Sequence, residues 1–175
     1  MEEAEFKIRL MQESDLPALE WDGEFTHFRL IYESVFKRMK RGSAMAWVAE
    51  NAEKKIVGQV FLQLDCDRPE LADGWSRAYL FSFRIKPEYR NREIGTRMVA
   101  VLENFLRERK FRSLTLNVAR NNPDAIRLYE RLGFKIVAPE PGIWSYVDHK
   151  HHLQTVEEPS WRMEKLLKAP PDPRS

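Results

Sequence analysis

A polar, arginine-rich stretch between Ile85 and Arg97 contains the residues best suited to hold an anion. It follows an apolar strand pattern and precedes an amphipathic helix pattern that begins near Gly95. The first N–H groups of a helix have no partners within it, and with the helix dipole they favour negative charge. Arg90, Arg92 and Arg97 add cations around that point. These residues alone leave two interpretations open, a cradle for a diphosphate and a solvated basic turn.

Tyr129 is an amphipathic residue whose role the residues alone leave open. It lies in a predicted helix whose start is marked by Asn122 as N-cap and Pro123 as the first helical residue, and whose end is marked by Gly133. The inner face of that helix carries Ala125, Leu128, Tyr129 and Leu132. The phenol could act as an acid, or it could pack with its tip hydrogen-bonded.

Two other candidates are weaker. The three histidines His149, His151 and His152 lack the helical i, i+4 pair and any cysteine partner, so no metal site is predicted there. Cys66 stands between Asp65 and Asp67, whose carboxylates disfavour a reactive thiolate.

The chain has 175 residues and a formal net charge of +2, with 43% hydrophobic residues. These values predict one folded domain and argue against a nucleic-acid or membrane partner. No apolar run reaches the roughly 20 residues that cross a bilayer, and the acidic N-terminus is unlike a secretory signal, so we expect a cytoplasmic location. The predicted domain spans residues 1–168, and residues 169–175 read as a proline-rich tail.

Strands outnumber helices in the predicted order, and helices fall between them, which indicates a mixed α/β sheet protein. A short helix is expected after a Ser14-Asp15 cap, and a longer one carries an apolar stripe from Phe25 to Met39 and stops at Gly42. The strands are expected at 6–11, 44–50, 56–64, 78–85, 114–118, 134–137, 143–147 and 161–167, with helices after Gly95 and Asn122. Between 147 and 161 the sequence reads as a loop rich in His and Glu.

Two segments resemble the signatures of the GNAT superfamily of acyl-CoA N-acyltransferases. The first is Ile85-x-Pro87 followed by Arg90-Asn91-Arg92-Glu93-Ile94-Gly95, and the second runs from Asn122 through Tyr129 to Phe134. Both occur in family order and at family separation, and the order of elements from Phe6 to Leu167 is consistent with them. The resemblance implies a single α/β (α+β) domain with a mixed, mostly antiparallel sheet of six to seven strands and about four helices. The fourth and fifth strands would splay into a V-shaped cleft.

The resemblance also implies a function, the transfer of the acetyl group of acetyl-CoA directly to a primary amine in a ternary complex. Tyr129 would be the general acid toward the departing thiolate, and the first helices would flank the acceptor side, where Trp21, Phe25, Phe28 and Tyr32 could line a pocket or belong to the core. The amine could be a small molecule or a protein amine, and the enzyme a monomer or homodimer. The acetyl-CoA contacts would come from the fourth strand, the loop and helix start after it, and the second motif: Phe83, Ile85, Arg90, Asn91, Arg92, Glu93, Ile94, Gly95, Thr96 and Asn122.

Two positions depart from the family pattern. Glu93 replaces the central glycine of the loop, and we expect its carboxylate to face solvent, where its charge is screened. Asn117 stands where some members carry a glutamate base, and it cannot accept a proton near neutral pH. Glu50, Asp65, His27 or a chain of waters could take that role. These departures leave a second hypothesis open, a module that binds acyl-CoA without catalysis.

Overall fold

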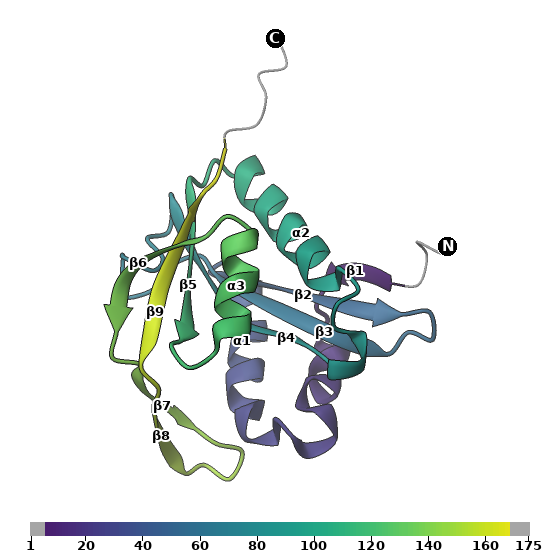
Figure 1. Cartoon of the computed structure of the whole chain (residues 1–175). Helices are drawn as coiled ribbons and strands as arrows, with labels where there is room; N and C mark the ends of the chain where they lie inside the picture. Colours follow the sequence, from purple (N-terminus) through teal and green to yellow (C-terminus); the bar gives the residue numbers. More distant parts are fainter. Residues whose placement is uncertain (1–5, 169–175) are drawn as a thin grey trace.

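The computed structural model describes residues 6–168, which form one central sheet with helices on both faces (Figure 1). The seven strands follow the order β1-β2-β3-β4-β5-β9-β6. Every neighbouring pair is antiparallel except β4 and β5, which run parallel. Their bounds are β1 Phe6–Leu10, β2 Ala44–Asn51, β3 Ile56–Gln63, β4 Arg77–Ile85, β5 Ser113–Ala119, β6 Lys135–Glu140 and β9 Ser160–Leu166. This architecture confirms the predicted fold class.

The helices divide between the two faces of the sheet. α2 (Ile94–Glu108) and α3 (Pro123–Arg131) cover one face, and α1 (Arg29–Arg41) covers the other together with the 3₁₀ segment η2 (Glu13–Gly23). Two shorter 3₁₀ turns are η3 (Thr26–Phe28) and η4 (Pro87–Tyr89). We refer to the two sides of the sheet as the α2 face and the α1 face.

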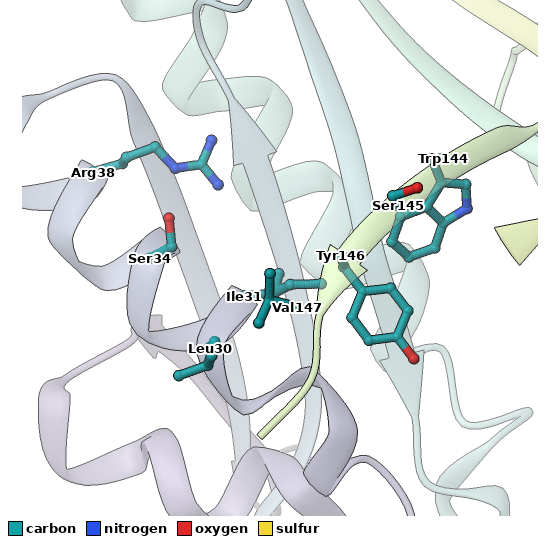
Figure 2. A pocket seen from close by; sticks show the side chains of 8 residues that line it. All are labelled: Leu30, Ile31, Ser34, Arg38, Trp144, Ser145, Tyr146 and Val147. Atoms are coloured by element: carbon teal, nitrogen blue, oxygen red, sulfur yellow. The ribbon is translucent and has the colours of Figure 1, made fainter. Parts of the chain in front are cut away.

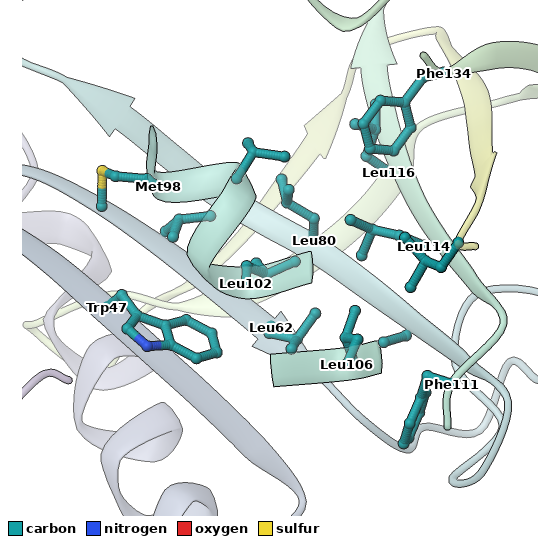
Figure 3. Packing of buried hydrophobic residues seen from close by; sticks show 14 of the residues in the cluster. Trp47, Leu62, Leu80, Met98, Leu102, Leu106, Phe111, Leu114, Leu116 and Phe134 are labelled. Atoms are coloured by element: carbon teal, nitrogen blue, oxygen red, sulfur yellow. The ribbon is translucent and has the colours of Figure 1, made fainter. Parts of the chain in front are cut away.

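The larger hydrophobic core lies on the α2 face, where the apolar stripe of α2 meets the middle strands (Figure 3). Met98, Leu102 and Leu106 repeat at helical spacing and are fully buried against Leu62 and Leu80. On the α1 face, Tyr32 and Val35 of α1 pack on a second cluster that includes Phe61. The sheet is therefore held from both sides, and its central strands are rigidly placed.

The parallel pairing of β4 and β5 is short. It joins Arg77–Leu80 to Ser113–Leu116 and ends there, although β4 continues to Ile85 and β5 to Ala119. Ser82 has a positive φ of 51°, and the register of β4 against β3 shifts between Gln59 and Phe61. Such a bulge bends a strand and increases its twist. The two strands are consequently no longer paired beyond Leu80 and Leu116, as the predicted splaying of the fourth and fifth strands requires.

Several predicted boundaries need correction. The helix predicted from Phe25 begins as α-helix only at Arg29, because residues 26–28 form a 3₁₀ turn. The short helix predicted after Ser14 is 3₁₀ and starts after Gln12, whose N–H donates to the Asp15 carboxylate at 2.7 Å.

The segment predicted as a His- and Glu-rich loop contains the strand β8 (Leu153–Glu157), which pairs with β7 (Ile143–Val147) in a separate hairpin. The proline-rich tail predicted at 169–175 lies outside the described residues. Within residues 6–168, no helix is both long enough and apolar enough to cross a lipid bilayer.

Candidate active site

The N-terminus of α2 lies directly after the divergent half of β4. The first helical bond runs from the Arg97 N–H to the Glu93 carbonyl at 3.0 Å, so the N–H groups of residues 93–96 precede the helical ladder. Asn91 and Glu93 both have positive φ, 62° and 63°, and Glu93 is the N-cap. Its side chain is exposed. The turn therefore presents a row of unused donors, the arrangement that binds phosphate groups at helix N-termini.

The three arginines predicted around this turn are not engaged by carboxylates among the described residues. Arg90 donates from Nε to the carbonyl of Ile85 at 3.0 Å, and the Arg92 guanidinium lies over the Tyr89 ring at 5.5 Å. Arg97 reaches the Phe6 carbonyl at 3.5 Å. Their charges remain uncompensated, which favours an anion at the turn.

Gly95 allows the first turn of α2 to approach β4 closely. A Cβ atom at this position would lie 3.1 Å from Cζ of Phe83, closer than ordinary van der Waals contact. The Phe83 ring in turn faces Tyr129 of α3, with ring centroids 6.4 Å apart. The two family-like segments, far apart in the sequence, thus meet across Phe83.

Tyr129 packs its ring on the α2-face core, 5.8 Å from the ring of Phe134. Its hydroxyl forms no hydrogen bond with any described residue and is not among the fully buried atoms that lack a partner. Burial of the ring, with a further contribution from the nearby Tyr79, raises the pKa of Tyr129 to about 12. The phenol is therefore protonated at neutral pH, as a proton donor must be.

Asn122 caps α3, as predicted from the sequence. Its Oδ1 accepts the N–H of Ala125 at 3.2 Å, and the side chain is exposed. The amide Nδ2 has no partner among the described residues, so a second contact through that atom is sterically open. A capping role and a ligand-binding role can coexist in this side chain.

The candidates for a general base are separated by the structure. The Glu50 carboxylate accepts a hydrogen bond from Arg9 Nε at 3.0 Å, near the β1 end of the sheet. Asp65 lies in the loop before β4, where its backbone forms an isolated antiparallel β-bridge with that of Asp73. His27 instead lies on the α1 face, with its ring 4.1 Å from that of Phe28. Asn117 lies on β5, and its Oδ1 is buried without a hydrogen-bond partner.

An aromatic group on the α1 face joins η3 and α1 to the hairpin β7–β8. We define it as Phe25, Phe28, Tyr32, Trp144 and Tyr146, and it contains three of the aromatic residues considered from the sequence. Phe28 is central, 5.1 Å from the Tyr146 ring and 6.3 Å from those of Tyr32 and Trp144. Trp21 extends the group through Phe25, at 5.1 Å.

Beside this aromatic group, a hollow of about 360 Å³ opens between α1 and β7 (Figure 2). The helix contributes Leu30, Ile31, Ser34 and Arg38, and the strand contributes residues 144–147. Arg38 donates to Gln63, and its Nε is buried without a partner. The volume of the hollow is within the range of small-molecule sites. The hollow lies beside α1, on the side that the resemblance assigns to the acceptor.

Sequence reasoning missed Arg84, whose guanidinium lies on the α1 face beside the bulge of β4. The signal was present, because Arg84 is a charged residue within an apolar strand pattern. Tyr79 was also missed; burial raises its pKa to about 12. Both residues belong to the strand that borders the cleft.

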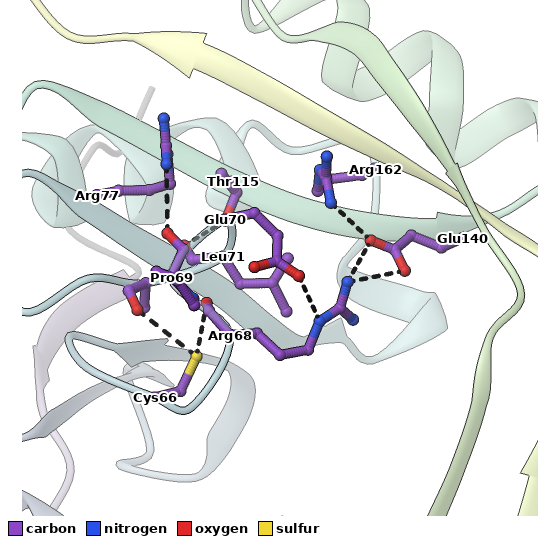
Figure 4. A network of polar contacts seen from close by, with 10 residues as sticks. Cys66, Arg68, Pro69, Glu70, Leu71, Arg77, Thr115, Glu140 and Arg162 are labelled. Atoms are coloured by element: carbon purple, nitrogen blue, oxygen red, sulfur yellow. Dashed lines mark hydrogen bonds and ion pairs between the residues drawn. The ribbon is translucent and has the colours of Figure 1, made fainter.

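An ion-pair network fixes the loop before β4 at the other end of the sheet (Figure 4). The buried Glu140 of β6 accepts Arg68 Nη2 at 2.8 Å and Arg162 Nη1 at 3.0 Å. Thr115 of β5 donates to the carbonyl of Leu71 in the same loop at 2.8 Å. The network connects residues 68–71 to β5, β6 and β9.

The three histidines considered for a metal lie in and beside the turn of the β7–β8 hairpin. The turn is organised by Asp148, which accepts the N–H groups of Lys150 and His152, both at 2.9 Å. Among residues 6–168, no three His, Cys, Asp or Glu side chains are arranged to hold a metal ion.

The model of the GNAT acetyltransferase family matches residues 8–134, and the chain belongs to that family. It is 33% identical over 97 residues to the probable N-acetyltransferase camello of Xenopus tropicalis, an alignment that covers 55% of this chain and 41% of camello. The chain thus spans less than half the length of this relative.

Solved structures show the same fold at low identity. The ribosomal-protein-S18-alanine N-acetyltransferase from Escherichia coli superposes with a TM-score of 0.69 at 19% identity, covering 96% of this chain and 97% of that one. Ard1 from Thermoplasma volcanium gives a TM-score of 0.72 at 18% identity, covering 94% and 99%.

Proposed function

We propose that this chain transfers the acetyl group of acetyl-CoA directly to a primary amine. The observation that carries the proposal is the hydroxyl of Tyr129, which forms no hydrogen bond with any described residue, on a ring that faces Phe83 of β4. The family supports the reaction class, and in the proposed reaction Tyr129 is the proton donor.

The proposed acetyl-CoA site is formed by β4, the N-terminus of α2 and the N-cap of α3. The diphosphate would accept from the free N–H groups of residues 93–96, assisted by Arg90 and Arg92. The pantetheine arm would pair with the unpaired edge of β4 near Phe83 and Ile85, where β5 has diverged. The Asn122 amide Nδ2 is free to contribute a further contact.

In the proposed reaction the neutral amine nitrogen attacks the thioester carbonyl carbon. An N–C bond forms, the C–S bond breaks, and the sulfur departs with the bonding electrons. Tyr129 gives its proton to that sulfur, and the proton that the nitrogen loses returns to the phenolate through water. Because Tyr79 and Tyr129 both have raised pKa values, neither is ionised enough to serve as the resting base near neutral pH.

The test measures turnover and thermal melting on the same Tyr129→Phe sample, with acetyl-CoA and an amine that the unaltered protein accepts. We expect turnover to fall by about 10²-fold, the low end for general acid catalysis because a thiolate leaves readily, with little change in Tm. Turnover within twofold of the parent would remove Tyr129 from the mechanism. Acetyl-CoA binding in calorimetry without transfer to any amine would favour the non-catalytic binding module.

A further inference from the structure

The Arg84 guanidinium is a cation without a matching anion on the α1 face. Its Cζ lies over the ring of Phe25 at 4.3 Å and over that of Phe28 at 5.2 Å. Nη1 donates to the Tyr32 hydroxyl at 3.1 Å and to Ser82 Oγ at 2.8 Å. Among the described residues no carboxylate forms an ion pair with it, and Nε and Nη2 donate to none of them.

Arg84 is half-buried, so its charge is partly withdrawn from water. Burial lowers the pKa of Arg84, and the carboxylate of Glu24, which is exposed, offsets that effect only from a distance. A charge withdrawn from water without a counter-ion is strongly disfavoured, and aromatic faces and hydroxyl groups compensate only in part. Arg9 and Arg162 on the sheet, and Arg68 in the loop before β4, each have a carboxylate partner.

A second unsatisfied group lies in the same place. Gln59 of β3 is only 1% exposed, its Nε2 is directed to Ser82 at 3.4–3.5 Å, and its Oε1 has no hydrogen-bond partner. Arg84 and Gln59 therefore both contact Ser82. Arg84 has donors that no described residue accepts, and Gln59 has an acceptor, Oε1, without a donor. An amine that also carries an anionic group would complement both.

The position of Ser82 connects this pair to the chemistry. Ser82 is the bulged residue of β4, next to Phe83, where the thioester would lie if the proposed function is right. An anion bound by Arg84 would lie close to the bulge, because Arg84 itself donates a hydrogen bond to Ser82. The amine of the same molecule must reach the thioester from there, so only a few bonds can separate the two groups.

We infer that the acceptor is a free amino acid, bound through its carboxylate by Arg84. The planar guanidinium offers two parallel donors, which match the two oxygens of a carboxylate. The rings of Phe25 and Phe28 hold the guanidinium in one orientation and exclude water from one side of it. This inference rests on the proposed function for the transfer step, but the carboxylate site can be measured without transfer.

The binding experiment uses 3-phenylpropionate, which has a carboxylate and no amine, and its neutral amide, 3-phenylpropionamide. Calorimetry should detect binding of the acid to the protein, and the affinity for the amide should be at least tenfold lower. Arg84→Gln should lower the affinity for the acid about 10- to 100-fold. Arg84→Lys keeps the charge without the fork and should retain part of the affinity. Arg109→Gln is the matched control, because Arg109 also stacks on an aromatic ring, Phe105, at 3.7 Å, at the far end of α2.

The kinetic experiment gives free amino acids and their α-amides as paired acceptors. We expect the acids to be acetylated with the lower KM, even though the less basic amine of an amide is more often neutral and hence nucleophilic. Arg84→Gln should raise KM for the acids at least tenfold and leave acetyl-CoA binding unchanged, whereas the Arg109→Gln control should leave both quantities unchanged.

Two results would overturn the inference. One is equal binding of the acid by the parent and by Arg84→Gln, or no preference of the parent for acid over amide. The other is a parallel loss of activity toward acids and amides in Arg84→Gln and Arg84→Lys with a lowered Tm, which would mark Arg84 as a structural residue. Carboxylate binding without any transfer would instead refute the proposed function and leave the anion site in place.

Discussion

Glu93 adopts a backbone conformation that glycine adopts without strain. Its φ of 63° and ψ of 9° lie in the left-handed region, which costs an ordinary L-residue about 1–2 kcal/mol. The conformation is imposed by the turn, which must present the N–H groups of residues 93–96 in one direction. The strain is local to the proposed diphosphate site, where such costs are commonly concentrated.

Replacing Glu93 with glycine should therefore stabilise the protein. We expect Glu93→Gly to raise the free energy of unfolding by about 0.5–1 kcal/mol, since the gain is reduced by the greater freedom of glycine in the unfolded chain. Because the carboxylate is exposed, affinity for acetyl-CoA should change less than tenfold. Urea unfolding and calorimetry measure the two quantities.

The control for this substitution is Glu88→Gly, in the 3₁₀ turn η4, where φ is not positive. There glycine relieves no strain and should lower stability. Equal effects of the two substitutions would show that the left-handed conformation at position 93 carries no cost.

At the scale of elements, the hairpin β7–β8 depends on contacts outside itself. Two strands alone are marginally stable, and here they are held by the stacking of Trp144 and Tyr146 against Phe28. The turn that joins them is fixed by Asp148. Its pKa is lowered to about 2, chiefly because the carboxylate accepts the N–H of His152 and then because it accepts the side chain of Gln154.

The stabilising effect of Asp148 should depend on pH in a predictable direction. Since its folded pKa lies below the ordinary value of 3.8, its contribution is present above pH 3.8 and is lost as the pH falls toward 2. Asp148→Ala should lower Tm near neutral pH, and the difference from the parent should shrink below pH 4. Glu157→Ala, an exposed change on β8, should show no such dependence, and a constant difference for Asp148→Ala would contradict the assignment.

At the scale of the whole molecule, the two halves of the sheet are joined by only a short run of strand pairing. β4 and β5 share four residue pairs, so the remaining connection has to come from elsewhere. The network of Arg68, Glu140 and Arg162 supplies it, by fastening the loop before β4 to β6 and β9. Glu140 is buried, and removing its charge would leave two arginines facing each other.

Glu140→Gln should accordingly destabilise the protein by about 2–3 kcal/mol in chemical denaturation. Glu70→Gln is the matched control, because Glu70 accepts the same arginine, Arg68, at an exposed position, where an ion pair contributes little. If the two variants unfold at the same denaturant concentration, the network does not hold the halves together.

Much of the fold could be predicted from the sequence because its signals are local. Asn122-Pro123 and Gly133 set the ends of α3, and the spacing of Met98, Leu102 and Leu106 identifies α2. The strand β8 escaped prediction because its residues are largely exposed, so no apolar alternation marks it. Its position depends on Asp148 and on pairing with β7.

The candidate site was predictable only in part. The motif residues lie on adjacent elements and could be placed together, but Arg84 and Gln59 meet through a bulge in β4 and a register shift that no local pattern reports. The start of α1 was set too early for a similar reason, since Phe25 and Phe28 continue the apolar stripe while packing as a 3₁₀ turn around Arg84.

The early end of β4–β5 pairing also bears on self-association. Beyond Leu80 and Leu116 the sheet contains two inward-facing edges, with backbone groups that no neighbouring strand satisfies. Exposed strand edges normally invite pairing with other chains and aggregation. Here both edges belong to strands in the middle of the sheet, and the outer strands are β1 and β6. We therefore expect the gap to be a poorer site for self-association than an outer edge.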